Sequence, residues 1–439
     1  EKKNEKEEEE EEENISAEQK RKKLAKDYLA SMQVNESDSE SSDEENEDNR
    51  YQNLSERLQR DRLEKQGKYV RELSSSFEVL QFENLQRTSY SGHELPVTCV
   101  ALTSDDTTVY SGSKDNSLMR IDVESGSKVF LRQKWRRSTH GDHQASGGEI
   151  LSVAVSTDGK YVASGGRDSY VRIYDSRTNS EIKAFSGHRD AVTCLTFRRD
   201  SPSLFSGSLD RCIKHWDMNE MGYLETLFGH QDSINSIDCW IKERPLTSGS
   251  DRTVRLWNVH DESHLVFRGQ KSIIDCCQYV TLDSYLSADE NGAICLWKET
   301  QKKPISIINH AHGMNGSIPN WITSMATLKI SDLAATGSSD GFLRFWSVHP
   351  DDKNGLNEIN QWNIGPGFIN GIALSSRLVV LGLGTEHRLG RWMKVKGAKN
   401  RVEIIKLPEE IYQSEGRLHS SRNGNNYKSE NSDSNSNSD

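Results

Sequence analysis

Residues 186–217 read SGHRDAVTCLTFRRDSPSLFSGSLDRCIKHWD, and residues 228–258 read FGHQDSINSIDCWIKERPLTSGSDRTVRLWN. Each stretch contains a Gly-His pair, an apolar run, a Ser-Gly-Ser turn followed by Asp, and a second apolar run that ends in Trp. Short apolar runs rich in β-branched and aromatic residues, separated by such turns, predict strands. The two stretches therefore predict one structural unit that is used twice in succession.

The same unit recurs along the chain, marked by an Asp or a substitute six residues before the Trp position. This position falls at Asp115, Asp168, Asp210, Asp251, Asn291, Asp340 and Glu386, with spacings of 53, 42, 41, 40, 49 and 46 residues. A repeat of about 40–45 residues with this signature is typical of WD repeats, which contribute four strands per blade. Seven such units close a ring. The sequence predicts an all-β, seven-bladed WD40 β-propeller over residues 76–407.

Individual blades depart from the pattern without breaking it. The two widest spacings locate insertions at residues 128–148 and 308–320. The substituted positions are Ile121 and Tyr174 for Trp, Gln270 for His, Asn291 for Asp and Gly382 for the hydroxyl residue. Two segments could supply the outermost strand of blade seven and so close the ring: residues 77–90 or Arg401–Leu407. We favour residues 77–90, which leaves RVEIIKL as an additional strand or a covering segment.

The repeated polar residues predict a hydrogen-bond network inside each complete blade. Asp in the turn accepts from His, His reaches the hydroxyl residue, and that hydroxyl bonds the indole N–H. The predicted structural network is His188, Ser206, Asp210 and Trp216 in one blade and His230, Thr247, Asp251 and Trp257 in the next. Ser, His and Asp together also suit a hydrolase. However, the Ser lies within a strand without a G-x-S-x-G elbow, and the set recurs in several blades. We expect no catalytic residues and no enzyme.

The ends of the chain differ in composition from the repeats. Residues 1–50 hold 19 acidic and 9 basic residues, out of a net charge of −11 for the whole chain. Such charge blocks repel and predict a disordered acidic tail. Residues 51–75 have a helical pattern of apolar positions and predict a short helical extension. Residues 408–439 predict a disordered polar tail.

Other site chemistry is weakly represented. The seven cysteines are odd in number and contain no CxxC pair, which predicts buried free thiols in a reducing compartment. His140, His143, His310 and His312 lie in the insertions without a nearby Cys, so we expect loop histidines and no metal. No apolar run reaches the roughly 18 residues of a membrane span. We expect no cofactor, no membrane association and no small-molecule substrate.

Basic residues concentrate in two segments that also contain Trp. Residues 377–406 carry a net charge of +6, and residues 128–143 form the second segment. Cations beside aromatics attract phosphate backbones and exposed bases; the alternative is a solvated rim. The RNA- or partner-binding candidates are Arg388, Arg391, Lys394, Lys396, Lys399, Arg401, Arg132, Lys134, Arg136 and Arg137.

The last blade should place Arg388 and Arg391 on a strand. Residues three apart on a strand point to opposite faces. At most one of the two is then expected to contact RNA, while the other anchors Glu386 or a neighbouring blade. The alternative is that Arg391 and Trp392 only complete the packing of the blade.

Residues 382–407 read GLGTEHRLGRWMKVKGAKNRVEIIKL. The EHRLGRW motif, the basic stretch with Asn400 and the apolar strand after it resemble the WD-repeat subunit of the U3 small nucleolar ribonucleoprotein. The segments KKLAKDYLASM (22–32) and SERLQRDRLEKQGKYVREL (55–73) resemble the helical segments that precede this family's propeller. The N-terminal poly-Glu and the Asn-rich C-terminal tail depart from the family pattern.

The resemblance implies a scaffold that binds U3 small nucleolar RNA at its box B/C element beside an L7Ae-like kink-turn-binding protein. It also implies contacts with other small nucleolar ribonucleoprotein and small-subunit processome proteins, and support for precursor rRNA processing. A nuclear and nucleolar location follows from the resemblance and from the basic KRKK patch at Lys20–Lys23. The alternative is a generic protein-interaction propeller, such as a ubiquitin-ligase substrate receptor or a chromatin reader.

Overall fold

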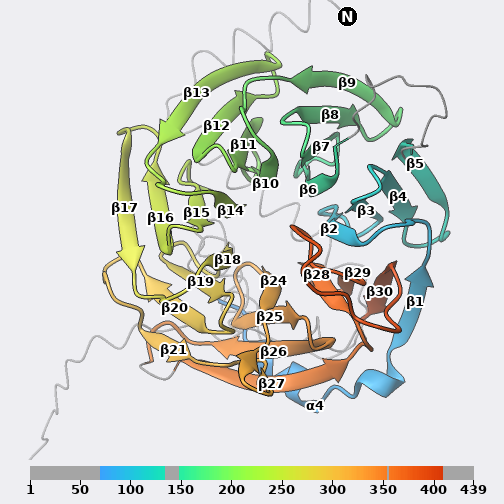
Figure 1. Cartoon of the computed structure of the whole chain (residues 1–439), viewed down its shortest axis with the longest axis vertical. Coiled ribbons are helices and arrows are strands. Elements are labelled where there is room, and N and C mark those ends of the chain that lie inside the picture. The colour runs from blue at the N-terminus through green and yellow to red at the C-terminus, as the bar shows by residue number, and fades with distance from the viewer. Residues whose placement is uncertain (1–69, 134–147, 353–354, 409–439) are drawn as a thin grey trace, which may run out of the picture. The chain divides into compact units, whose positions relative to one another are not determined.

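The computed structural model describes residues 70–133, 148–352 and 355–408, all within the compact unit that spans Arg60–Asp439. The expected acidic tail, most of the expected helical extension and the polar tail after residue 408 lie outside the described residues. The described chain forms seven four-stranded antiparallel sheets arranged in a ring (Figure 1). The structure is the seven-bladed propeller that the repeat spacing predicts.

Each blade runs from an innermost strand at the channel to an outermost strand at the rim. Blades one and two are β2 (Val97–Leu102), β3 (Thr108–Ser113), β4 (Leu118–Asp122) and β5 (Lys128–Arg132), then β6 (Ile150–Val155), β7 (Tyr161–Gly166), β8 (Val171–Asp175) and β9 (Ser180–Phe185). Blades three and four are β10 (Val192–Phe197), β11 (Ser203–Ser208), β12 (Cys212–Asp217) and β13 (Gly222–Phe228), then β14 (Ile234–Asp238), β15 (Leu246–Gly249), β16 (Thr253–Asn258) and β17 (Ser263–Arg268). Blades five and six are β18 (Ile274–Tyr279), β19 (Ser284–Asp289), β20 (Ile294–Lys298) and β21 (Ser306–Ile308), then β24 (Ile322–Thr327), β25 (Leu333–Ser338), β26 (Phe342–Val348) and β27 (Leu356–Asn363).

Burial explains why the strands differ in sequence. The inner strands are packed on both faces by neighbouring blades, so runs such as LFSGS in β11 are wholly buried. The outer strand β9 has only Phe185 buried, and its other residues face solvent. The core is divided among the blade interfaces, as where Phe205 and Ile213 of blade three pack with Ile234 of blade four.

Blade seven joins the two ends of the propeller. Its strands are β28 (Phe368–Leu374), β29 (Leu378–Gly384), β30 (Arg401–Lys406) and β1 (Gln86–Tyr90), in that order from the channel. The outermost strand comes from the N-terminal side, as favoured above. The interpretation of RVEIIKL as an additional or covering strand is wrong, because β30 lies between β29 and β1, with Ile405 opposite both Val379 and Arg87.

The segment before β1 is fastened to blade six. Arg71 forms a parallel bridge with Ser331, and the Asp332 carboxylate accepts hydrogen bonds from the amides of Leu73 (2.7 Å) and Ser74 (3.1 Å). The short helix α4 (Ser74–Val79) follows and lies beside β27 (Figure 1). Its Phe77 is buried in the cluster that spans blades six and seven, so the closing segment contributes to the core.

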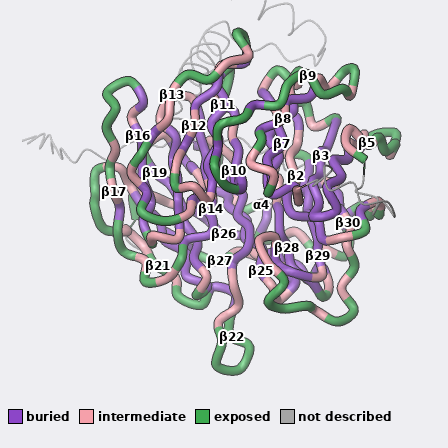
Figure 2. Tube along the Cα trace, turned by 45° about the horizontal axis from the view of Figure 1, so that its top comes forward, coloured by how far each residue is buried: buried purple, intermediate pink, exposed green. Residues whose placement is uncertain are grey.

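The insertion before blade six forms a small hairpin, β22 (Met314–Asn315) and β23 (Ile318–Pro319). Figure 2 shows it standing out from the body of the propeller with an exposed tip. The insertion after blade one continues from β5 into residues 134–147, which lie outside the described residues.

All seven cysteines are free, and six are buried while Cys212 is partly exposed. Burial raises the pKa of the Cys194 thiol to about 12, so it stays protonated. These thiols pack as small apolar groups, as predicted. Among the described helices, none is long and apolar enough to cross a membrane.

Candidate nucleic-acid interface

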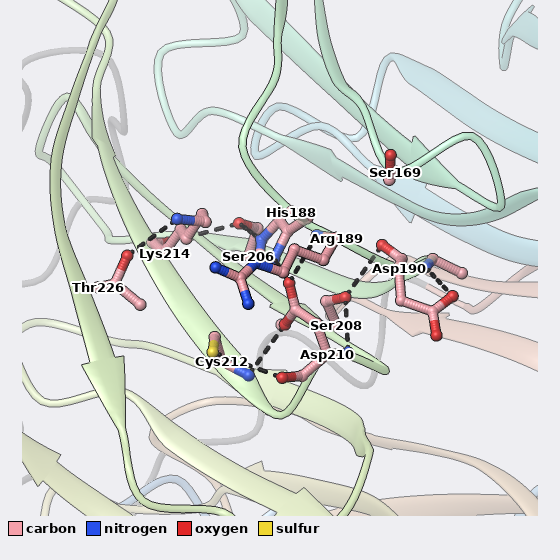
Figure 3. Close-up of polar contacts among 12 residues, drawn as sticks. Ser169, His188, Arg189, Asp190, Ser206, Ser208, Asp210, Cys212, Lys214 and Thr226 are labelled. Atoms are coloured by element: carbon pink, nitrogen blue, oxygen red, sulfur yellow. Dashed lines mark hydrogen bonds and ion pairs between the residues drawn. The ribbon is translucent and has the colours of Figure 1, made fainter.

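The hydrogen-bond network of blade three connects its turn to its third strand (Figure 3). His188 bonds the Asp210 carboxylate through Nδ1 at 2.9 Å and the Ser206 hydroxyl through Nε2 at 2.7 Å. The Trp216 indole donates to the same hydroxyl at 2.8 Å. Burial raises the pKa of Asp210, but hydrogen bonds from His188 and the Arg189 amide outweigh it and lower the pKa to about 2. The Asp210 carboxylate is therefore used in hydrogen bonds that stabilise the turn.

The same hydrogen-bond network recurs in other blades. In blade four, His230 lies 2.9 Å from Asp251 and 2.8 Å from Thr247, which accepts from Trp257 at 2.8 Å. In blade five, Gln270 takes the place of His in this network, and its amide oxygen accepts from the Ser287 hydroxyl at 2.6 Å. A repeated set of this kind is a packing device of the blades.

Blade six corrects one expectation. His312 is not a loop histidine: it lies 3.1 Å from Asp340 and 2.8 Å from Thr336, which accepts from Trp346. The insertion separates His312 from Thr336 by 24 residues, against 18 between His188 and Ser206, and this spacing hid its role.

Blade seven replaces the short turn between its second and third strands with a long loop. β29 ends at Gly384 and β30 begins at Arg401, so residues 385–400, here called the motif loop, contain the whole EHRLGRW motif. The expectation that Arg388 and Arg391 lie on a strand is wrong. The third strand follows the loop, and Ile404, opposite Val380, takes the place that Trp216 has opposite Leu204.

Arg388 enters the central channel. It lies in a cavity of about 140 Å³ lined by the innermost strands of all seven blades. Its Nη2 donates to the main-chain carbonyl of Asn235 at 2.9 Å and to that of Asp275 at 3.3 Å. Of the two arginines considered above, Arg388 is the one that is anchored to other blades, namely blades four and five across the channel, and it is partly buried.

Other contacts hold the motif loop over the mouth of the channel. Lys114 of blade one donates to the carbonyl of Gly390 at 2.9 Å, and Arg167 of blade two donates to that of Leu389 at 3.2 Å. At the base of the loop, the Asn400 side chain accepts from the amide of Thr385 and donates to the carbonyl of Glu94. The loop is fixed by blades one, two, four and five.

The buried groups around Arg388 have shifted pKa values. Burial, assisted by the charges of Arg388 and Lys114, lowers the pKa of His387 to about 3, so this imidazole is neutral. Burial raises the pKa of Asp275 to about 7, although Arg388 opposes this rise. The channel therefore places the Arg388 guanidinium beside a carboxyl group whose pKa burial has raised towards neutral pH.

The other candidate residues divide into exposed and engaged groups. Arg391 is 63% exposed, and its Nε lies 3.8 Å from the Glu386 carboxylate. Three further cations of the loop are exposed: Lys394, Lys396 and Lys399. Arg401 is engaged by Glu403 at 2.7 Å, and Arg132 lies 3.5 Å from Asp168. The remaining candidates, Lys134, Arg136 and Arg137, lie outside the described residues.

The sequence marked Trp392 as an aromatic residue within the basic segment, but it did not identify the aromatic partners of Trp392. Trp392 is 67% exposed, so the expectation that it completes the packing of the blade is wrong. Its ring centroid lies 6.0 Å from that of Trp321, which follows the blade-six insertion, and 5.5 Å from that of His387. These rings form one side of a pocket of about 520 Å³ at the mouth of the channel. Trp321 carries no motif of its own, so no sequence signal linked it to the last blade.

Comparison with known proteins places the chain in its class. The WD domain, G-beta repeat model matches residues 84–122, 136–175, 179–217 and 222–258, so the protein is a WD-repeat propeller. It is 35% identical over 413 residues to U3 snoRNP-associated protein-like EMB2271 of Arabidopsis thaliana, covering 89% of this chain and 85% of that relative. It is 36% identical over 401 residues to U3 small nucleolar RNA-interacting protein 2 of Homo sapiens, covering 89% and 82%.

Solved structures agree with these relatives. The structure of U3-55K has a TM-score of 0.68 and 38% identity, over 73% of this chain and 98% of that chain. The RRP9 WD40 repeats have a TM-score of 0.68 and 37% identity, over 74% and 100%. The chain belongs to the family of WD-repeat proteins associated with the U3 small nucleolar ribonucleoprotein, as the EHRLGRW motif predicts.

Proposed function

We propose that the protein is a non-catalytic scaffold of the U3 small nucleolar ribonucleoprotein in the nucleolus. It binds U3 small nucleolar RNA at the box B/C element together with an L7Ae-like protein, and it supports the processing of precursor rRNA for the small subunit. The observation that carries the proposal is the motif loop, which the partly buried Arg388 fixes across the channel while later residues of the loop expose cations.

The exposed cations suit an RNA backbone. Lys394, Lys396 and Lys399 have no carboxylate within ion-pair distance among the described residues, so their charges remain available to phosphates. Neutralising phosphates releases counterions, which drives association in a salt-dependent way. The loop is held in place before binding, so little conformational entropy is lost when RNA docks.

The same geometry argues for a scaffold. The Ser, His and Asp residues of the blades are satisfied by one another, and the Asp210 carboxylate is used in a turn. His387, within the motif loop, is buried, and burial lowers its pKa to about 3, so it is neutral. The broad exposed faces of a seven-bladed ring leave room for the L7Ae-like protein and for other processome proteins around one RNA.

Crosslinking of the tagged full-length chain to RNA in growing cells, followed by sequencing of the bound RNA, tests the proposal. We expect U3 small nucleolar RNA to dominate the recovered sequences, with reads concentrated at box B/C. Recovery of protein partners without a small nucleolar RNA would contradict the proposal. That result would favour the protein-interaction propeller, such as a substrate receptor or a chromatin reader.

A further inference from the structure

The mouth of the channel on the side of the motif loop holds a largely apolar pocket. Its volume of about 520 Å³ lies in the range of about 300–1,000 Å³ that is usual for sites of small organic groups. The apolar lining consists of Leu151, Ala191, Leu209, Ile273, Trp321, Leu389 and Trp392. Blades two to six contribute to it, and the motif loop of blade seven completes it.

One wall of the pocket is an exposed aromatic ring in a fixed position. The Trp392 indole lies over Gly390, where an added Cβ would be 2.6 Å from the ring atoms, so only glycine lets the ring fold back onto the loop. Trp321 packs against it at an interplanar angle of 65°, and His387 at a tilt of 38°. A large apolar ring left 67% exposed, yet held by three neighbours, is poised to stack on a ligand.

Charges of both signs lie in and beside the pocket, and Arg167 and Glu290 are among its lining residues. Arg391 and Lys394 flank Trp392 in the chain and are exposed. Glu290 lines the pocket from blade five, and its carboxylate has no hydrogen-bond donor among the described residues. A ligand that bridges these groups would place negative charge near Arg391 and Lys394 and an N–H donor near Glu290.

We infer that the pocket receives one unpaired nucleobase of the bound RNA, stacked on Trp392, with the adjoining phosphates on Arg391 and Lys394. This inference rests on the proposed function and identifies where a base, as distinct from the backbone, is held. Single-stranded bases stack on aromatic side chains, and carboxylates accept from the exocyclic amino groups of bases.

An acidic peptide would satisfy the cations but would bring its charge towards Glu290. A simple apolar side chain would use the pocket and leave Glu290 without a donor. A nucleotide satisfies both sides at once, because its negative charge lies on the phosphate and its N–H groups lie on the base. The described geometry therefore favours RNA over a protein segment as the occupant.

Crosslinking of the tagged full-length chain in cells, with mass spectrometry of the crosslinked peptides, tests the inference. We expect a nucleotide adduct on the peptide that contains Trp392 or on the one that contains Trp321. Trp392→Ala and Trp392→Leu should lower the yield of U3 RNA and weaken its binding to the purified protein by about fivefold or more, the low end for loss of one stacked base. Trp392→Phe should restore most of the binding, because a ring is retained.

Phe228→Ala is the matched control, since Phe228 is a 70% exposed aromatic on β13 away from the pocket. It should leave RNA binding unchanged, and all variants should keep the wild-type melting temperature. Equal RNA affinity for Trp392→Leu and wild type, with adducts only elsewhere, would overturn the pocket assignment and leave the proposed function standing. So would loss of a protein partner alone in Trp392→Ala. Failure of the wild-type chain to recover U3 RNA would instead overturn the proposed function itself.

Discussion

The guanidinium of Arg388 donates a hydrogen bond to the main-chain carbonyl of Asn235, 2.9 Å away and 153 positions earlier in the chain. The contact crosses the channel from blade seven to blade four. Through this contact the EHRLGRW motif links two distant blades and helps to hold the ring together. The residues that follow are then the ones available to face RNA, because the Arg388 guanidinium is engaged by main-chain carbonyls in the channel.

Arg388→Ala should destabilise the propeller. The substitution leaves the carbonyls of Asn235 and Asp275 without this donor inside the channel, at a cost of about 1–3 kcal/mol in the free energy of unfolding. Urea denaturation of the purified chain measures the change. Arg391→Ala is the control, because Arg391 is 63% exposed and should change stability by less than about 0.5 kcal/mol. Equal stability of both variants would show that Arg388 does not help to hold the ring together.

Asp275 should make stability depend on pH. The folded protein raises the pKa of this buried carboxyl from 3.8 to about 7, so protonation stabilises the folded state. This stabilisation is complete below about pH 4 and is lost as the pH rises through about 7. Asp275→Asn cannot ionise, so its free energy of unfolding relative to wild type should increase between pH 5 and pH 8. Urea denaturation at both pH values measures it, with exposed Asp200→Asn as the control. If the difference in free energy of unfolding between Asp275→Asn and wild type stays constant with pH, the raised pKa of Asp275 is contradicted.

The number of blades could be predicted from the sequence because each blade is specified by local patterns. The positions of Asp210 and Trp216, six residues apart, mark a turn and the strand after it, and this spacing recurs around the ring. The same rule failed at Glu386 and Trp392, which have the same separation but belong to one loop. The true third strand, β30, has Ile404 at the Trp position, so it gave no signal.

The candidate site depended on contacts that no local pattern contains. Arg388 is held by strands more than 100 positions away, and Trp392 meets Trp321 only because blades six and seven are neighbours in the ring. Charge counting identified a basic segment, but it could not separate Arg388 and Arg401, which are engaged by other groups, from the exposed lysines.

Asp210→Ala should act through folding. The change leaves the buried His188 and the amides of Arg189 and Cys212 without their acceptor, which should cost about 1–3 kcal/mol in the free energy of unfolding. RNA binding should fall only as far as the folded fraction falls, which thermal unfolding and binding measured on one sample will show. Loss of binding with an unchanged melting temperature would reopen a direct role for this network.

The KRKK patch should direct the protein to the nucleus. Replacement of Lys20–Lys23 by alanine removes the basic cluster and should shift a tagged full-length chain towards the cytoplasm, measured by fluorescence microscopy against a nucleolar marker. Replacement of Lys2, Lys3 and Lys6 is the control, because these lysines lie among glutamates. A wild-type chain that stays cytoplasmic in growing cells would contradict the nucleolar assignment.

Charge reversal at Lys394, Lys396 and Lys399 should weaken RNA binding most. All three are exposed on the motif loop, and each phosphate contact that is lost removes a released counterion. Titration of U3 RNA at several salt concentrations should show lower affinity and a shallower dependence, by nearly one unit of log–log slope per lost contact.

The control for these lysines reverses an equal charge at Lys160, Lys302 and Lys303. These residues lie in the connections β6–β7 and β20–β21, at the end of the blades opposite to the motif loop. The control should keep the wild-type affinity and slope, since only the total charge changes and contacts are retained. Unchanged affinity and slope in the motif-loop variant would move the RNA surface to residues 128–143, with Arg132, Lys134, Arg136 and Arg137. Because Arg132 already lies 3.5 Å from Asp168, the other three would then have to carry the contacts.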